Sequence, residues 1–145
     1  MIQVVVSAEK LNKLLLELQR QSKNTLPAMR AIAGIMMFST EENFEKEGRP
    51  KWEDLKQKTK DRRAKKGKWP GKMLQVSSGG LAASISGKAE NTRATVGTNK
   101  AYAAAHQFGY GPKNIPERPF LKLQKSDITD AEKVLIRHLL PKKEV

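Results

Sequence analysis

Hydrophobic residues recur at helical spacing in three stretches of the chain, and the first stretch begins close to residue 8. It holds four leucines at positions i, i+3, i+4 and i+7, which are Leu11, Leu14, Leu15 and Leu18. Residues at this spacing share one face of a helix. Ser7, just before the stretch, is a residue type that caps helix N-termini. The pattern predicts an amphipathic helix that presents a leucine face.

A second helical pattern follows Pro27, whose fixed φ angle suits the first turn of a helix. Its apolar positions are Met29, Ala33, Met36 and Phe44, widened by Ile32, Ile35 and Met37. We therefore predict a long helix over residues 27–47. A stripe this broad is typical of a central core helix, and it is also what a helix that contacts another subunit presents. Both interpretations stay open at this point.

The third helical pattern lies near the C-terminus. Its residues at helical spacing are Ile128, Ala131, Leu135, His138 and Leu139, with Asp127 before them in the position of an N-cap. Pro141 stops the pattern and leaves a charged tail over residues 141–145. We predict a terminal helix that begins at Asp127.

Alternation of apolar and polar residues indicates strands in two places. Ile2, Val4 and Val6 predict a short strand at the N-terminus. Residues 82–89 and 93–97 have the length and alternation of an antiparallel hairpin, with Glu90 and Asn91 at the turn. The hairpin is the main sheet that the sequence predicts.

Between the hairpin and the terminal helix, glycine and proline set the local structure. We expect a short helix over residues 101–107, capped by Asn99 and ended by Gly109. The 109–114 loop is expected to hold no regular structure. Pro116 and Pro119 then force an extended path into residues 120–123.

Charge changes this picture most between residues 46 and 72, where twelve Lys or Arg face four Asp or Glu. An apolar stripe is nearly missing, so we predict a mobile basic loop around a marginal helix at 54–66. Such cations can neutralise phosphates, and Trp52 or Trp69 could stack on unpaired bases. The candidate contacts are Lys56, Lys58, Lys60, Arg62, Arg63, Lys65, Lys66 and Lys68. The alternative is a solvated charged loop without a ligand.

Composition limits the class of protein. A chain of 145 residues fits one domain spanning 1–145, with the basic segment as an insertion. A net charge of +13 favours a polyanion or an acidic protein surface as partner. The absence of cysteine excludes a disulfide framework and suits a reducing cytoplasm. We expect neither a signal peptide nor a membrane-spanning helix, because no apolar run is long enough.

Candidate chemistry is sparse, because only His106 and His138 could act as general bases near neutral pH and no serine has the context of a nucleophile elbow. His138 near a helix C-terminus is explained by the helix dipole. His106 at a helix end is expected to bond a loop carbonyl through its ring. We therefore predict no enzymatic activity, no cofactor and no metal site.

Four short motifs follow one another in a fixed order along the chain. They are Trp52-x-x-Leu55-x-x-x-Thr59, the segment from Ser78 to Ile85 with Gly79-Gly80-Leu81, the segment Tyr102-Ala-Ala-Ala-His106-Gln-Phe108-Gly109, and Ile115-Pro116-Glu-Arg118-Pro119-Phe120-Leu121. Over about residues 25–140 this order resembles the phage virion morphogenesis, or tail-completion, family found in Mu-like phages. The lysine-rich stretch after Thr59 departs from that pattern.

The resemblance implies an α+β fold in which long helices pack on a small antiparallel sheet. It implies a structural role in virion assembly, tail completion or head-tail joining, as a component of a homo-oligomeric ring. The implied partners are other phage head or tail proteins. The place of action would be the host cytoplasm during assembly, and the virion if the protein is retained. A stand-alone module that binds nucleic acid non-specifically through residues 46–72 is the alternative.

The motif residues are the structural or interface candidates: Trp52, Leu55, Thr59, Tyr102, His106, Phe108, Gly109, Pro116, Arg118, Pro119 and Phe120. The helix at 27–47 and the hairpin edge are the expected contact surfaces between copies. Arg118 is expected to pair with a carboxylate, inside the subunit or on a neighbour. A purely intramolecular fixing of the loop is the alternative for Arg118.

Overall fold

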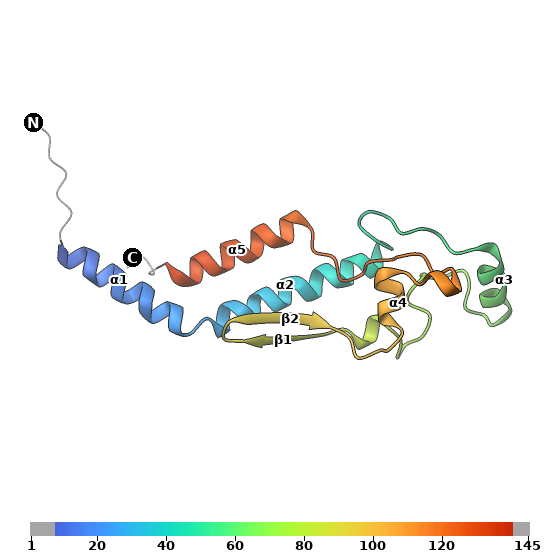
Figure 1. The fold of residues 1–145 in the computed structure, drawn as a ribbon, viewed down its shortest axis with the longest axis horizontal. Helices are drawn as coiled ribbons and strands as arrows, with labels where there is room; N and C mark the ends of the chain where they lie inside the picture. The colour runs from blue at the N-terminus through green and yellow to red at the C-terminus, as the bar shows by residue number, and fades with distance from the viewer. Residues whose placement is uncertain (1–7, 141–145) are drawn as a thin grey trace, which may run out of the picture.

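The computed structural model describes residues 8–140, which form an elongated α+β fold (Figure 1). Its helices and strands in chain order are α1 (Ala8–Lys23), α2 (Leu26–Glu45), α3 (Gln57–Lys65), β1 (Ser86–Glu90), β2 (Arg93–Gly97), α4 (Ala103–Phe108) and α5 (Lys125–Leu139). Two single 3₁₀ turns, Ala82–Ser84 and Gly111–Lys113, complete it. The strand predicted at residues 2–6, the cap at Ser7 and the tail lie outside the described residues.

Helix α2 is the central element, with the hairpin along one side and α5 along the other (Figure 1). The antiparallel hairpin pairs Ser86 with Gly97 and Glu90 with Arg93. Its turn is fixed to the chain between α1 and α2, because the Asn91 side chain accepts a hydrogen bond from the Thr25 amide at 2.9 Å. This arrangement confirms the predicted fold of long helices on a small antiparallel sheet.

The hydrophobic core lies at the C-terminal end of α2 rather than along its whole length. It consists of Phe44, Trp52, Met73, Leu74, Leu81, Ala103 and Phe120. The Phe44 ring stacks on Phe120 at a centroid distance of 5.3 Å and meets Trp52 edge-on at 6.1 Å. Aromatic pairs in these geometries contribute beyond their buried area. The core therefore joins α2 to segments that follow it by up to 76 residues in sequence.

The leucine helix is confirmed as α1, but its apolar face is only partly buried. On that face Leu14 and Leu15 are 40 and 54% exposed and Leu18 is half-buried, while Leu16, off that face, is 65% exposed. Helix α1 projects from one end of the molecule and contacts α5 (Figure 1). The chain alone therefore leaves several leucines in water.

Four local predictions need correction. The first hairpin strand is shorter than 82–89, because residues 82–84 form a 3₁₀ turn. Asn99 does not cap α4, whose N-cap is Tyr102. The 109–114 loop is not irregular throughout, since it holds a 3₁₀ turn closed by a bridge between Tyr110 and Ile115.

The fourth correction concerns α5, which begins two residues before its predicted N-cap. Gln124 is the N-cap and Asp127 is the third helical residue. The Gln124 amide donates to the Asp127 carboxylate at 2.7 Å, which completes a capping box. An acidic residue at this position serves the helix terminus as well as an N-cap would.

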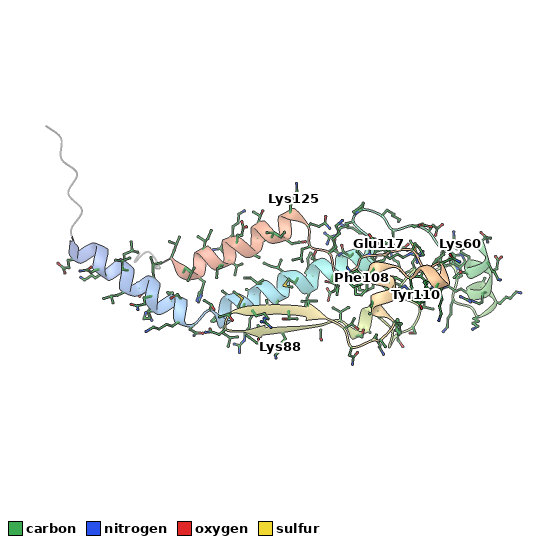
Figure 2. The ribbon with its side chains drawn as sticks, in the orientation of Figure 1. Lys60, Lys88, Phe108, Tyr110, Glu117 and Lys125 are labelled. Atoms are coloured by element: carbon green, nitrogen blue, oxygen red, sulfur yellow. The ribbon has the colours of Figure 1, made fainter. Side chains whose placement is uncertain are left out.

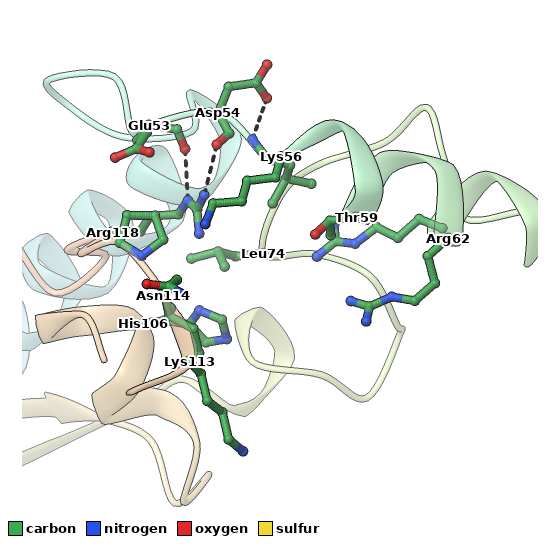
Figure 3. A pocket seen from close by; sticks show the side chains of 14 residues that line it. Glu53, Asp54, Lys56, Thr59, Arg62, Leu74, His106, Lys113, Asn114 and Arg118 are labelled. Atoms are coloured by element: carbon green, nitrogen blue, oxygen red, sulfur yellow. Dashed lines mark hydrogen bonds between the residues drawn. The ribbon is translucent and has the colours of Figure 1, made fainter. Parts of the chain in front are cut away.

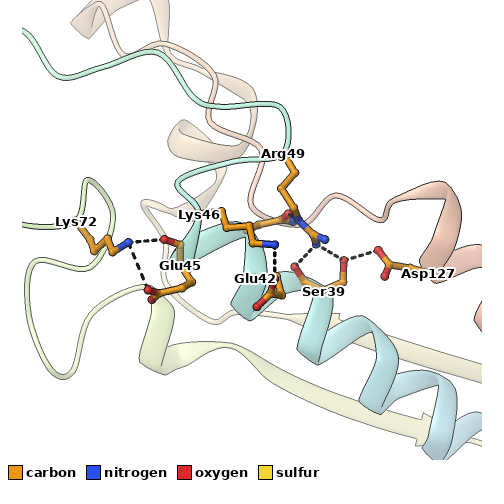
Figure 4. Close-up of polar contacts among 8 residues, drawn as sticks. Ser39, Glu42, Glu45, Lys46, Arg49, Lys72 and Asp127 are labelled. Carbon is orange, nitrogen blue, oxygen red and sulfur yellow. Dashed lines mark hydrogen bonds and ion pairs between the residues drawn. The ribbon is translucent and has the colours of Figure 1, made fainter.

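A buried polar network connects α2, the following turn and α5 (Figure 4). The Arg49 guanidinium donates to the carbonyl and to the hydroxyl of Ser39, both at 2.8 Å. The Ser39 hydroxyl donates in turn to the Asp127 carboxylate at 2.5 Å. Arg49 also donates to the Asn43 side-chain oxygen at 2.8 Å. The network sets the angle at which α5 packs on α2.

The basic segment is anchored at several points. Trp52 is buried in the core, Arg63 donates to the Met73 carbonyl at 3.0 Å, and Lys72 donates to the Glu45 carbonyl. A helix forms inside the predicted 54–66 range as α3. The mobility of this segment stays a prediction.

None of the helices in residues 8–140 has the length and apolar character needed to cross a bilayer.

Candidate functional site

Residues from three of the sequence motifs line one cavity beside α3 and α4 (Figure 3). Leu55 and Thr59 come from the first motif, His106 from the third, and Pro116 and Arg118 from the fourth. The cavity has a volume of about 410 Å³. The fold therefore brings together side chains separated by up to 63 positions.

Arg118 is the most buried charged residue of this site, with 4% of its surface exposed. Its guanidinium donates to the main-chain carbonyls of Glu53 at 3.0 Å and Asp54 at 3.2 Å. Burial lowers the pKa of Arg118, while the neighbouring Glu53 and Asp54 carboxylates oppose that effect. Within the described residues the guanidinium donates to backbone oxygens and not to a carboxylate, which agrees with the alternative of an intramolecular fixing of the loop. Pairing with a carboxylate of a neighbouring copy stays a prediction.

His106 is half-buried beside Arg118. Its main-chain carbonyl accepts a hydrogen bond from the Arg118 amide at 2.7 Å, so the expected ring-to-carbonyl bond is replaced by a backbone bond. The ring lies edge-on to Tyr102 at 6.1 Å, and its buried Nδ1 has no partner in the described residues. Burial lowers the pKa of His106, and the Arg118 and Arg63 cations lower it further.

Cations dominate the remaining walls of the cavity. Lys56 and Arg62 come from the α3 side, and Lys113 comes from the loop after α4 (Figure 3). Burial lowers the pKa of Arg63, with further contributions from Arg118 and Arg62. The cavity is therefore an electropositive recess.

Asp54, one of the two acidic residues that line the cavity, makes an ion pair and a hydrogen bond at its rim. The Asp54 carboxylate pairs with Lys60 at 2.5 Å, and that hydrogen bond is the main cause of its lowered pKa. Its second oxygen accepts the Leu55 amide at 2.7 Å. The Asp54 carboxylate therefore connects the loop to α3, and it contributes little to neutralising the cations of the recess.

The remaining motif residues fix the loops around the cavity. Trp52 donates from its indole to the Pro119 carbonyl at 3.3 Å, and Phe120 is fully buried. Gly109 has φ +78°, and a Cβ there would lie 3.1 Å from the Ile115 carbonyl oxygen and from the Glu117 nitrogen. Only glycine fits this close approach.

Two aromatic motif residues face solvent instead. Phe108 is 75% exposed and Tyr102 is 48% exposed, and Figure 2 shows Phe108 near Tyr110 on the outside of the ribbon. They are free for contacts that the isolated chain does not make.

The predicted nucleic-acid contacts divide into two groups. The exposed group begins with Lys56 at the N-cap of α3. It continues with Lys58, Arg62 and Lys65 on the exposed side of the helix and with Lys66 and Lys68 after it. The other group is tied to the protein and consists of Lys60, which pairs with Asp54 and lies 5.4 Å over the Trp69 ring, and of half-buried Arg63. Trp52 cannot stack on a base because it lies in the core, and Trp69 is half-buried under Lys60.

Sequence reasoning missed the polar network of Ser39, Asn43, Arg49 and Asp127. A signal was present, because Ser39, Thr40 and Asn43 interrupt the apolar stripe of α2 on its buried side. Buried polar residues at helical spacing indicate a specific polar partner. The partner, Arg49, follows α2 by four residues and returns over it through a sharp turn at Gly48.

The motif residues thus fall into two kinds: some fix loops by packing and hydrogen bonds, and others, such as Phe108, are exposed on the surface. Within residues 8–140 no three His, Cys, Asp or Glu side chains gather as a metal site would require. The chain belongs to the phage virion morphogenesis family, whose sequence profile matches residues 6–140.

Individual relatives agree with that membership. The chain is 38% identical over 136 residues to "Mu-like prophage FluMu G protein 2" of Haemophilus influenzae, covering 90% of each chain. It is 36% identical to "Mu-like prophage FluMu G protein 1" of the same organism, covering 76% of each. It is 33% identical to "Putative capsid assembly protein G" of Escherichia phage Mu, covering 67% of this chain and 68% of that one. No solved structure matches the chain.

Proposed function

We propose that this protein is a structural part of phage assembly that acts in tail completion or head-tail joining as one copy of a homo-oligomeric ring. Its partners are other phage head or tail proteins. It works in the host cytoplasm during assembly and stays in the virion if it is retained. The observation that carries the proposal is α1, an amphipathic helix whose leucines are exposed in a single copy. Exposed apolar faces of this kind serve as contact surfaces.

The charges favour a second copy of this chain as the partner that covers the exposed leucines of α1. The helix carries four basic and two acidic residues around its leucines. On α2, Glu41, Glu42 and Glu45 line part of a groove of about 510 Å³. Glu42 pairs there with Lys46 and Glu45 with Lys72, so Glu41 is the acidic residue that the proposal assigns to α1. The groove is lined in part by Met37, Phe38, Ala83 and Ile85, and Phe38 is 64% exposed. A basic amphipathic helix is complementary to such a groove.

A contact between α1 of one copy and α2 of the next is heterologous, because two different surfaces meet. Repetition of such a contact gives a ring when the rotation closes. Most of α2 packs on the hairpin and α5, so only its acidic, Phe38-bearing side serves as a contact surface. The hairpin edge stays a predicted contact surface.

The test is the mass of the protein in solution, by size-exclusion chromatography with light scattering. We expect Leu15→Glu to shift an oligomer to monomer, because a charge replaces an apolar contact. Lys13→Gln, an equal change of charge at an exposed position on the opposite face of the same helix, should leave the mass unchanged. A wild-type chain that stays monomeric at every concentration overturns the ring.

The chain contains no cysteine, so the contact itself can be trapped. A mixture of Leu15→Cys and Ala83→Cys chains should form a disulfide-linked heterodimer under oxidising conditions. A mixture of Lys13→Cys and Ala83→Cys chains is the control, because residue 13 lies on the opposite face of α1. Equal cross-linking in both mixtures contradicts the α1-to-α2 contact. Failure of Leu15→Glu to complement particle formation would link the contact to virion assembly.

A second candidate function is non-specific nucleic-acid binding by the exposed cations of α3 and the turn after it. Each phosphate neutralised by Lys or Arg releases counterions, so affinity falls with salt. The triple variant Lys58→Gln, Lys65→Gln and Lys66→Gln should reduce the slope of log affinity against log salt by about 2–3. An unchanged slope in a DNA-retention assay leaves no DNA role for these residues.

A further inference from the structure

The recess beside α3 and α4 gathers five cationic side chains around one cavity. They are Lys56, Arg62, Arg63, Lys113 and Arg118, against two acidic residues, Glu53 and Asp54. In Figure 3 Lys56 and Arg118 lie beside Leu74 and Arg62 comes from the α3 side, whereas the Lys113 side chain extends past His106 in another direction. Five cations and two carboxylates leave a net charge of +3 around a space of about 410 Å³.

These cations are not neutralised inside the subunit. Among residues 8–140, no carboxylate lies within ion-pair distance of any of the five, and Asp54 pairs with Lys60 instead. Arg63 and Arg118 donate to main-chain carbonyls, which carry only partial charges. These hydrogen bonds give the guanidinium N–H groups acceptors, but they do not neutralise the positive charge of the two arginines.

The cationic groups repel one another across the recess. Arg118 and Arg62 contribute, after burial, to the lowered pKa of Arg63. Arg118 and Arg63 likewise contribute, after burial, to the lowered pKa of His106. An anion in the recess reverses this repulsion, because an opposite charge within about 4–6 Å favours the protonated forms.

The rest of the wall supplies further contacts for a ligand. Thr59 and Asn114 line the recess and offer a hydroxyl and an amide as donors. The buried Nδ1 of His106 has no partner among the described residues. Leu55 and Leu74 give the wall an apolar part. The recess therefore matches an anionic group joined to an apolar one.

We propose that this recess binds the carboxylates of an acidic peptide segment of a partner protein. Arg62, Lys56 and Lys113 hold the carboxylate oxygens, and the leucines take the adjoining methylene groups. A duplex fits poorly, because Arg118 is 4% exposed at the base of the recess and Trp52 is buried in the core. The partner's place in virion assembly rests on the proposed function, whereas the binding is measured on the isolated chain.

The two histidines allow a direct test, because His106 lines the recess and His138 lies on α5. A capped oligoglutamate peptide is titrated into the protein while the imidazole resonances are followed by NMR. We expect a saturable shift of the His106 resonance and an upward shift of its pKa. The groups that face its ring are Arg118, Arg63 and Tyr102. The His138 resonance should not follow the titration.

Two variants of equal charge separate the recess from general electrostatics. The Lys56→Gln, Lys113→Gln variant changes exposed residues that line the recess, whereas Lys58→Gln, Lys66→Gln changes exposed residues outside it. We expect the first to weaken peptide binding by about tenfold, the loss of charge-assisted hydrogen bonds. The second should weaken binding by less than about twofold, as screened surface charges do.

Three outcomes overturn the inference. They are equal weakening by the two variants, no saturable response of His106, and a response to inorganic phosphate or to a thymidine oligonucleotide but not to the peptide. The mass of the oligomer is measured on the same samples. Loss of the ring with peptide binding intact would refute the proposed function alone, and the reverse result would refute this inference alone.

Discussion

Two buried side chains, Asn43 and Trp52, donate hydrogen bonds to the segment at residues 119–122. Proline at 116 and 119 removes two amide donors, so this extended segment cannot form a regular ladder. Side chains satisfy its carbonyls instead. Asn43 donates to the Phe120 and Lys122 carbonyls at 2.8 and 2.9 Å, and Trp52 donates to the Pro119 carbonyl. Buried carbonyls require such partners, which explains the concentration of polar residues here.

At the residue scale, Arg118→Ala should destabilise the monomer by about 2–4 kcal/mol, because two carbonyls lose charge-assisted donors. Urea unfolding measures the change. The exposed Arg30→Ala on α2 should cost less than about 0.5 kcal/mol. Arg118→Ala that folds as stably as Arg30→Ala but no longer assembles would instead establish an interface role.

The stability of the protein should also depend on His106 near neutral pH. Its folded-state pKa is lowered by burial and by Arg118 and Arg63, so the unfolded chain binds the proton more readily. The contribution is therefore fully present above the ordinary pKa of about 6.5 and is lost as pH falls below it. The slope from one group is at most about 1.4 kcal/mol per pH unit.

The measurement is the free energy of unfolding from about pH 7.5 to 5, for wild type and for His106→Gln. The variant should lose the part of the slope below about pH 6.5. Identical slopes in both proteins would show that His106 titrates alike in the folded and unfolded states.

At the scale of elements, α5 depends on one carboxylate with two roles. Asp127 accepts the Gln124 amide in the capping box and the Ser39 hydroxyl from α2. Its side chain thus caps the N-terminus of α5 and also holds α5 against α2. The neighbouring Asp130 is exposed on the same helix and makes neither of these two bonds.

Asp127→Asn should therefore destabilise the fold by about 1–2 kcal/mol, because an amide accepts these bonds less strongly than a carboxylate. Asp130→Asn is the matched control and should change stability by less than about 0.5 kcal/mol. Thermal unfolding followed by circular dichroism compares them. Equal effects of the two changes would mean that only the overall charge of the helix start matters.

At the scale of the whole molecule, the core lies at one end and α1 projects from the other (Figure 1). Amides protected by a packed core exchange only on global unfolding, whereas sparsely packed elements open locally. In dilute solution, α1 amides should exchange fastest among the helices and those of residues 39–45 slowest. Hydrogen exchange with mass spectrometry tests this order. Rising protection of α1 with protein concentration would agree with its burial against a second copy.

The local patterns predicted much of the secondary structure. The spacing of leucines gave α1, the stripe after Pro27 gave α2, and residues 93–97 form β2 with the predicted bounds. These elements follow from side-chain periodicity, which is set by backbone geometry alone. The helix ends at Asn99 and Asp127 were wrong, because several residue types can satisfy the same terminal groups and neighbours decide which one does.

The candidate site was predictable only in its parts. The motifs identified Leu55, Thr59, His106 and Arg118, yet nothing in their spacing placed them around one cavity. The structure agrees with the intramolecular alternative for Arg118, but its two targets could not be predicted, because a free main-chain carbonyl has no signature in the sequence.

The amino-acid sequence by itself determined the amphipathic helices, the hairpin, the excess of positive charge and the family, because these depend on residue types and their order. Tertiary structure decided that Leu14 and Leu15 of α1 stay exposed, that Trp52 is a core residue, and that five cationic residues line one recess. Burial and proximity are properties of packing between distant segments, and local periodicity carries no information about which segments meet.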